Sequence, residues 1–250
     1  MTSDVPTGLA FVNPAETQDT YRTCLWAAPG SGKSVAAASA PAPILVLSAD
    51  RPSAYKYARK HHAGKEIREV RYVNSNTLSE VYKYLAAADC DIRTVVIDPV
   101  SNIIDRLRDE APIAGDGPDH QWVNRKFLGF VVELRKFDVN VVLVAHEKLN
   151  DGKHGDNKLY PSMGGATLIN KLLAEMDFVA HIEQHVPEDG DPTWVGQVQP
   201  RGNLVCKDGT DALDARVEAN LTWWFDTATA ALAVETPDEL PFDEKSGGPK

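Results

Sequence analysis

The chain has 250 residues, of which 43% are hydrophobic and 25% are charged, and its formal net charge is −10. This balance indicates a globular protein with a sizeable core, and the acidity argues mildly against nucleic acid as a partner, since phosphates attract basic surfaces. No apolar run approaches the roughly 20 residues needed to cross a bilayer, and the N-terminus lacks the features of a signal peptide, so we expect a cytoplasmic protein with no membrane partner.

Strand-like apolar runs alternate with helix-like segments, which predicts an α/β fold with a mostly parallel sheet flanked by helices. The runs that we expect to form strands are 21–26, 42–49, 93–99, 140–146 and 176–183. Helical spacing of apolar residues predicts a helix over 120–137. Long polar connections are expected at 109–119 and 147–165. The chain then divides into an N-terminal extension (1–19), one core (20–234) and an acidic tail (235–250) that we expect to be disordered.

The stretch LWAAPGSGKSVAAA (25–38) has the spacing of a phosphate-binding loop. Its backbone N–H groups and the helix that follows would surround the phosphates of a nucleotide. Lys33 would reach the β- and γ-phosphates, and the Ser34 hydroxyl would bind Mg²⁺. Ala27 stands where the motif has its first glycine, which costs little unless φ is positive there. The alternative is a chance glycine turn before an alanine-rich helix. The residues expected to line the nucleotide are Pro29, Gly30, Ser31, Gly32, Lys33 and Ser34.

An acidic residue follows a neighbouring apolar strand, as the metal site of such a loop requires. The run TVVID ends in Asp98, about sixty-five positions after the loop, and Asp98 is the predicted second protein ligand of Mg²⁺. Taken alone, an aspartate there could equally cap a helix. Together with the loop, it predicts a P-loop NTPase that uses ATP and Mg²⁺.

The run VLSADRPSAYKYARK and the segment SMGGATLINKLLAEMDFVAHI resemble the RecA recombinase family, over roughly residues 20 to 183. The resemblance implies that Asp50 is the catalytic acid, that Tyr57 stacks on adenine and that His146 senses the γ-phosphate. Asp50 is one methylene shorter than the family's glutamate, which favours slow turnover. Each residue has an alternative role: Asp50 as a helix cap, Tyr57 as a packing residue and His146 as a core histidine. The chain is similar to the RecA-core proteins of bacteriophages, which act in single-strand annealing, so its compartment would be the host cytoplasm.

The connection 147–165 corresponds in position to a DNA-binding loop of that family. It is rich in glycine and contains one aromatic residue, and its lysines are offset by Glu147, Asp151 and Asp156. A solvated surface loop is the alternative. The resemblance also implies self-association into a ring or filament, with cations reaching the nucleotide of a neighbouring subunit. The residues expected to bind single-stranded DNA are Lys148, Lys153, Lys158 and Tyr160, and those expected to reach across subunits are Arg201 and Lys207.

The function that we expect is ATP binding and slow, DNA-dependent ATP hydrolysis coupled to single-strand annealing or homologous recombination. A nucleotide-gated adapter without significant hydrolysis is the main alternative. A nucleotide kinase ranks lower, because the sequence offers no arginine-rich lid beyond DRLRDE (105–110). The tail segment DELPFDE (238–244) resembles the acidic tip of bacterial single-strand-binding proteins, and it could bind the partners of that tip or fold back on the DNA groove. The alternative is a disordered tail that only keeps the protein in solution.

Overall fold

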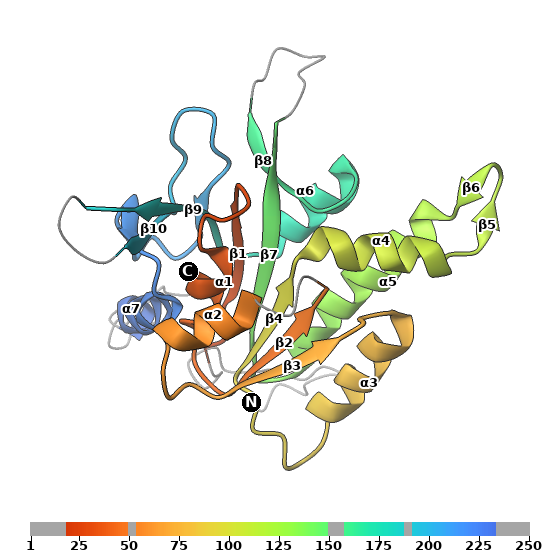
Figure 1. Cartoon of the computed structure of the whole chain (residues 1–250), viewed down its shortest axis with the longest axis horizontal. Coiled ribbons are helices and arrows are strands. Elements are labelled where there is room, and N and C mark those ends of the chain that lie inside the picture. Colours follow the sequence, from red (N-terminus) through yellow and green to blue (C-terminus); the bar gives the residue numbers. More distant parts are fainter. Residues whose placement is uncertain (1–18, 50–53, 150–157, 188–191, 234–250) are drawn as a thin grey trace, which may run out of the picture.

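The computed structural model describes residues 19–49, 54–149, 158–187 and 192–233. Its centre is a ten-stranded sheet, in which the order β12-β10-β9-β1-β7-β4-β2-β3 forms the main path, while β8 pairs with β7 and β11 with β9 (Figure 1). The strands from β9 to β3 along that path run parallel, whereas β8, β10, β11 and β12 pair antiparallel. The strands are β1 (Arg22–Ala27), β2 (Ile44–Ser48), β3 (Ile67–Arg71), β4 (Thr94–Asp98), β7 (Asn140–Leu149), β8 (Leu159–Ser162), β9 (Phe178–His185), β10 (Thr193–Gln197), β11 (Lys207–Asp208) and β12 (Arg216–Glu218).

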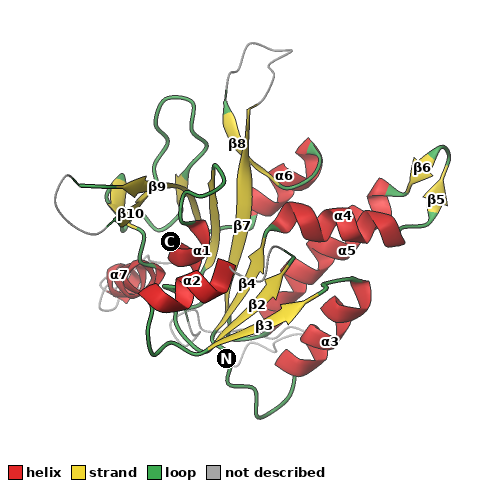
Figure 2. Ribbon diagram, viewed as in Figure 1, coloured by secondary structure: helices red, strands yellow, loops and turns green. Residues whose placement is uncertain are grey.

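Helices cover both faces of the sheet (Figure 2). One face packs against α1, α2 and α7, and the other against α3, α4, α5 and α6. This arrangement follows from the parallel strands, because the helix that connects two parallel strands must cross one face of the sheet. The helices are α1 (Lys33–Ala37), α2 (Ala54–His61), α3 (Ser75–Leu85), α4 (Val100–Glu110), α5 (His120–Glu133), α6 (Ala166–Ala174) and α7 (Leu221–Ala233).

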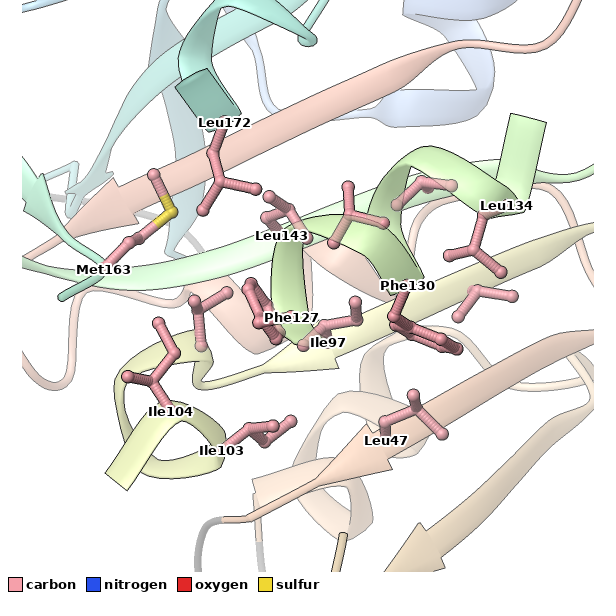
Figure 3. Close-up of a cluster of buried hydrophobic side chains, with 14 of the residues drawn as sticks. Leu47, Ile97, Ile103, Ile104, Phe127, Phe130, Leu134, Leu143, Met163 and Leu172 are labelled. Atoms are coloured by element: carbon pink, nitrogen blue, oxygen red, sulfur yellow. The ribbon is translucent and has the colours of Figure 1, made fainter. Parts of the chain in front are cut away.

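Two hydrophobic cores lie on opposite faces of the sheet, and the central strands β1, β2, β4 and β7 contribute alternate residues to them. Figure 3 shows the core under α4, α5 and α6, where Ile97 of β4 and Leu143 of β7 lie close to Phe127 of α5. The other core buries Trp224 of α7 together with Phe178 of β9. Both cores hold the carboxyl ends of β1, β4 and β7 in fixed register, which is where the predicted site residues are found.

The mostly parallel α/β fold is confirmed, and each of the five expected strands is present with shifted ends. The helix expected over 120–137 is α5 followed by a 3-10 turn, Leu134–Lys136. The two connections expected at 109–119 and 147–165 are shorter in the structure than predicted, because helix and strand residues occupy part of each. The segment 109–119 contains the end of α4 and a small hairpin of β5 (Ile113–Ala114) and β6 (Gly117–Pro118), and β7 continues to Leu149 before β8 returns beside it. Residues 1–18 of the expected extension (1–19), residue 234 and the whole expected tail (235–250) lie outside the described residues.

Ser39, just beyond α1, joins the start of the domain to its end. Its hydroxyl donates to the carbonyl of Ala36 (2.6 Å) and accepts from the backbone N–H of Leu221 (2.7 Å). Its carbonyl accepts from the hydroxyl of Thr222 (2.6 Å) and from the ammonium of Lys65. The first turn of α7 is therefore attached to the end of the helix that follows the phosphate-binding loop.

No helix in the described part of the chain is long and apolar enough to span a membrane.

Candidate nucleotide-binding site

The phosphate-binding loop connects the carboxyl end of β1 to the first turn of α1. Gly30 and Gly32 have φ of 83° and 90°, in the left-handed region that favours glycine. Ala27, in contrast, is the last residue of β1 and pairs with His146 of β7. An extended strand residue accommodates a Cβ without strain, so the alanine in place of the motif's first glycine leaves the loop backbone undisturbed.

Lys33 lies beneath the loop with only 6% of its surface exposed. Its ammonium donates to the carbonyls of Ala27 (3.0 Å) and Ala28 (2.7 Å). These bonds hold a positive charge at the start of the loop. A phosphate oxygen that binds there would meet a charged hydrogen-bond donor.

Ser34 and Asp98 meet as the sequence predicts. The Ser34 hydroxyl donates to Oδ2 of Asp98 over 2.7 Å, and Asp98 is 4% exposed. A third residue, which sequence reasoning missed, completes the group: the hydroxyl of Tyr55 donates to the same Oδ2 over 2.8 Å. Burial, and then the neighbouring Asp98 carboxylate, raise the pKa of Tyr55 well above its ordinary value. Tyr55 therefore stays a protonated hydrogen-bond donor.

Ser34 and Asp98 fit Mg²⁺, because a hydroxyl and a carboxylate are hard oxygen ligands. Within the described residues, no group of three or more histidine, cysteine or acidic side chains could hold a metal ion by itself. Magnesium typically takes one or two protein ligands and completes its shell with phosphates and water. The donor set therefore suits a metal that arrives with a nucleotide. Asp50, the predicted catalytic acid, lies outside the described residues.

His146 lies beside the loop, since β7 pairs it with Ala27. It shares the alternation of Val142 and Val144, which pack toward α1, so its side chain belongs to the same face as the loop. Among the described residues its buried Nδ1 has no hydrogen-bond partner. The sensor role stays a prediction.

An aromatic row leads from α2 to the loop. The ring centroids of Tyr57 and His61 are 4.6 Å apart, and those of His61 and Trp194 are 4.9 Å apart. Trp194 of β10 packs against Gly32, where an added Cβ would lie 1.7 Å from the indole Nε1. Tyr57 itself is 52% exposed. No local sequence pattern connects Trp194 with the loop, because the contact depends on how β10 pairs with β9.

A cavity of about 220 Å³ lies next to this aromatic row, beside α1. His61 and Trp194 line it together with Glu218, at the end of β12, and Asn220, just before α7. Trp194 both lines this cavity and packs against Gly32 of the loop. Tyr57 is not among its lining residues, so stacking of Tyr57 on adenine stays a prediction.

The predicted DNA-binding residues lie at the far end of β7. Lys148 of β7 is directly opposite Tyr160 of β8, and these two strands extend beyond the ends of their neighbours (Figure 1). Lys148 and Tyr160 also line a cavity of about 290 Å³ with Gly164 and Gly165. Lys158 is exposed just before β8. Lys153 lies outside the described residues.

The two candidates for subunit contact lie apart. Arg201 is exposed in a turn that reaches β8 through a bridge between Leu204 and Leu159. Lys207 is in β11, and its ammonium donates to the carbonyl of Met176 in the same chain. Arg201 is therefore the better placed of the two to meet another molecule. Their roles across a subunit boundary stay predictions.

The glycine loop after β1, the buried lysine and the contact of Ser34 with Asp98 at the end of β4 define a P-loop NTPase domain, with β7 lying between the two strands. A family model described as an AAA domain matches residues 19–212, and the chain belongs to this family. No curated protein matches the chain. The P-loop NTPase core is thereby confirmed, and with it nucleotide binding and membership of a class of ATPases. The relationship to phage recombination proteins stays a prediction.

Proposed function

We propose that this protein is a DNA-dependent ATPase that binds single-stranded DNA and promotes annealing or homologous recombination. It would form a ring or filament on the strand, and its acidic tail would bind partners of single-strand-binding proteins. ATP and Mg²⁺ are its proposed cofactors. The observation that carries the proposal is the continuity of β7, which runs from the nucleotide loop at His146 to Lys148 opposite Tyr160.

The nucleotide half of the proposal assigns a step to each residue of the site. Lys33 binds the β- and γ-phosphates, and Ser34 and Asp98 hold Mg²⁺. When bound, the metal ion neutralises the charge that develops on the phosphates. Asp50 orients the attacking water, and His146 contacts the γ-phosphate or the space it leaves.

The DNA half rests on position and on the chemistry of the side chains. His146 and Lys148 are two residues apart on one strand and therefore point to the same face. Tyr160, directly across from Lys148, offers a flat ring beside a cation. A cation paired with an aromatic ring suits single strands, because bases stack on the ring while the cation meets a phosphate. Loss of the γ-phosphate would change the contacts of His146. Because Lys148 is on the same strand, the change would reach the DNA contact.

The test compares DNA binding and ATP hydrolysis in the double variant Lys148→Ala/Tyr160→Ala with those of the wild type. Fluorescence anisotropy with a labelled oligo(dT), from 50 to 200 mM salt, should show about a tenfold or greater loss of affinity, since stacking is worth about 1–3 kcal/mol per base. The slope of log affinity against log salt should fall by about 0.7 for each DNA phosphate that the variant no longer neutralises. Stimulation of the ATPase by DNA should disappear while the basal rate persists.

The matched control is Lys136→Ala/Tyr84→Ala, which removes an exposed lysine and a partly exposed tyrosine elsewhere on the surface. It should bind DNA like the wild type. If the wild type hydrolyses ATP at the same rate with and without single-stranded DNA, and does not speed the annealing of complementary strands, the proposal is wrong. ATP binding without hydrolysis would instead favour a nucleotide-gated adapter.

A further inference from the structure

Tyr55 is the most deeply buried polar group of α2. It is 2% exposed, whereas Tyr57, two residues further on, is 52% exposed. A buried phenol needs a hydrogen-bond partner, and that of Tyr55 is the carboxylate of Asp98, 43 positions away. This contact reaches from the first turn of a helix into the metal site.

The hydroxyls of Ser34 and Tyr55 both donate to Oδ2 of Asp98, over 2.7 and 2.8 Å. They approach from different helices, α1 and α2. Two donors on one oxygen limit the rotation of the carboxylate, because any large turn of the group breaks at least one bond. Partners outside the ligand shell that hold a ligating carboxylate in this way tune metal affinity by roughly 10- to 100-fold.

Tyr55 also fixes the position of α2 relative to β4. The backbone N–H of Ala49, just after β2, donates to the carbonyl of Asp98 over 3.0 Å. The side chain of Tyr55, at the start of α2, donates to the carboxylate of the same residue. Both described ends of the β2–α2 connection are therefore bonded to Asp98.

We propose that Tyr55 is a positioning residue for Mg²⁺, whose hydroxyl orients the Asp98 carboxylate toward the metal that accompanies a nucleotide. The inference rests on the nucleotide-binding part of the proposed function and is independent of DNA. It assigns Tyr55 no contact with substrate. Its signature is a changed requirement for Mg²⁺ with an unchanged affinity for the nucleotide alone.

The experiment titrates Mg²⁺ while following the binding of a fluorescent ATP analogue to Tyr55→Phe. The variant is expected to need about tenfold more Mg²⁺ than the wild type for half-maximal enhancement of binding. In EDTA, both proteins should bind the analogue equally. The control is Tyr21→Phe: Tyr21 is 5% exposed, and its hydroxyl shares a 3.0 Å hydrogen bond with Thr229, outside the metal site. Its titration should match the wild type.

A second pair of variants tests the inference even if Tyr55→Phe does not fold. With 4-fluorophenylalanine at position 55, the space is filled without a donor, so the higher Mg²⁺ requirement should remain. With 4-aminophenylalanine a donor returns, and the requirement should move back toward the wild-type value. A Mg²⁺ requirement within twofold of the wild type in the donor-free variants overturns the inference. If the wild type itself shows no Mg²⁺-dependent binding of the analogue, the nucleotide site fails, and the role of Tyr55 fails with it.

Discussion

Trp194 of β10 packs directly on Gly32, 162 positions earlier in the chain, at the last turn of the phosphate-binding loop. Gly32 has φ of 90°, and a Cβ there would lie 1.7 Å from the indole Nε1. The loop is thus held from outside by the antiparallel part of the sheet. Its shape depends on β10 as well as on its own glycines.

Gly32→Ala should therefore destabilise the protein and abolish nucleotide binding. A non-glycine residue in a disfavoured backbone conformation costs about 1–3 kcal/mol, and the collision with Trp194 adds to that. Thermal unfolding and equilibrium binding of a fluorescent ATP analogue measure the two effects. Gly30→Ala is the matched control, since φ is 83° there but no atom lies within 4 Å of the added Cβ. Equal losses of stability in the two variants would contradict a specific role for Trp194.

Lys33→Ala should keep the fold and lose nucleotide binding. A hydrogen bond to a charged group is worth about 1.5–3 kcal/mol, so affinity should fall by about 10- to 100-fold or more. Isothermal titration calorimetry with ATP and Mg²⁺ measures the loss, and circular dichroism checks the fold. Lys83→Ala removes an exposed lysine of α3 as a control. Wild-type affinity in Lys33→Ala would contradict the role given to the loop.

Asp50→Asn tests the predicted acid, which lies outside the described residues. If Asp50 orients the attacking water, ATP binding should be retained, and the rate of hydrolysis should drop by about 10²- to 10⁴-fold, because the carboxylate is needed in the transition state. Single-turnover hydrolysis beside a binding titration separates the two quantities. An unchanged rate would reduce Asp50 to a helix cap.

A mixing experiment tests whether subunits share a site. Lys33→Ala subunits lack the phosphate-binding lysine, and Arg201→Ala subunits lack the exposed arginine near β8. If Arg201 acts on a neighbour's nucleotide, each variant alone should be inactive, and a mixture should recover part of the ATPase rate, because some interfaces combine one intact half from each. The same mixture with Lys207→Ala examines the second candidate. Wild-type activity of Arg201→Ala alone would exclude that residue.

His62 should make the stability of the protein depend on pH. Burial lowers the pKa of His62 below its usual 6.5, although the 2.9 Å hydrogen bond from its Nε2–H to the Val35 carbonyl partly opposes the shift. The unfolded chain then binds the proton more readily than the folded one, so the His62 contribution is complete above pH 6.5 and is lost as pH falls through the lower folded-state pKa. Urea unfolding from pH 5 to 8 should show a smaller decline toward acid in His62→Gln. Identical profiles would contradict this.

Local patterns predicted the central strands and the meeting of Ser34 with Asp98. Both rest on short-range signals, namely apolar runs and a motif at fixed spacing. β3 was not predicted, because it is an edge strand with the sequence IREVR. Its charged residues interrupt the apolar run by which the other strands were recognised. The mixed polar surface of such a strand resembles a loop.

The roles within α2 could not be read from the sequence, because Tyr55 and Tyr57 occur in the same short run. Only the packing of the helix decides that Tyr55 faces the sheet and Tyr57 faces outward. The contact of Trp194 with Gly32 depends on the register of β10 against β9, which brings together residues with no local relation. Long-range pairing of this kind carries no periodic signal in the sequence.

The hydrogen bonds between α7 and Ser39 show that residues beyond the family match belong to the folded domain. The family match ends at residue 212, whereas the N–H of Leu221 and the hydroxyl of Thr222 bind Ser39. A chain shortened to the matched residues would also lose Trp224 and Phe225 from its core, which would expose apolar surface behind α1. The residues matched by the family model are therefore fewer than those that form the folded domain. A fragment containing residues 19–212 alone should be prone to aggregation.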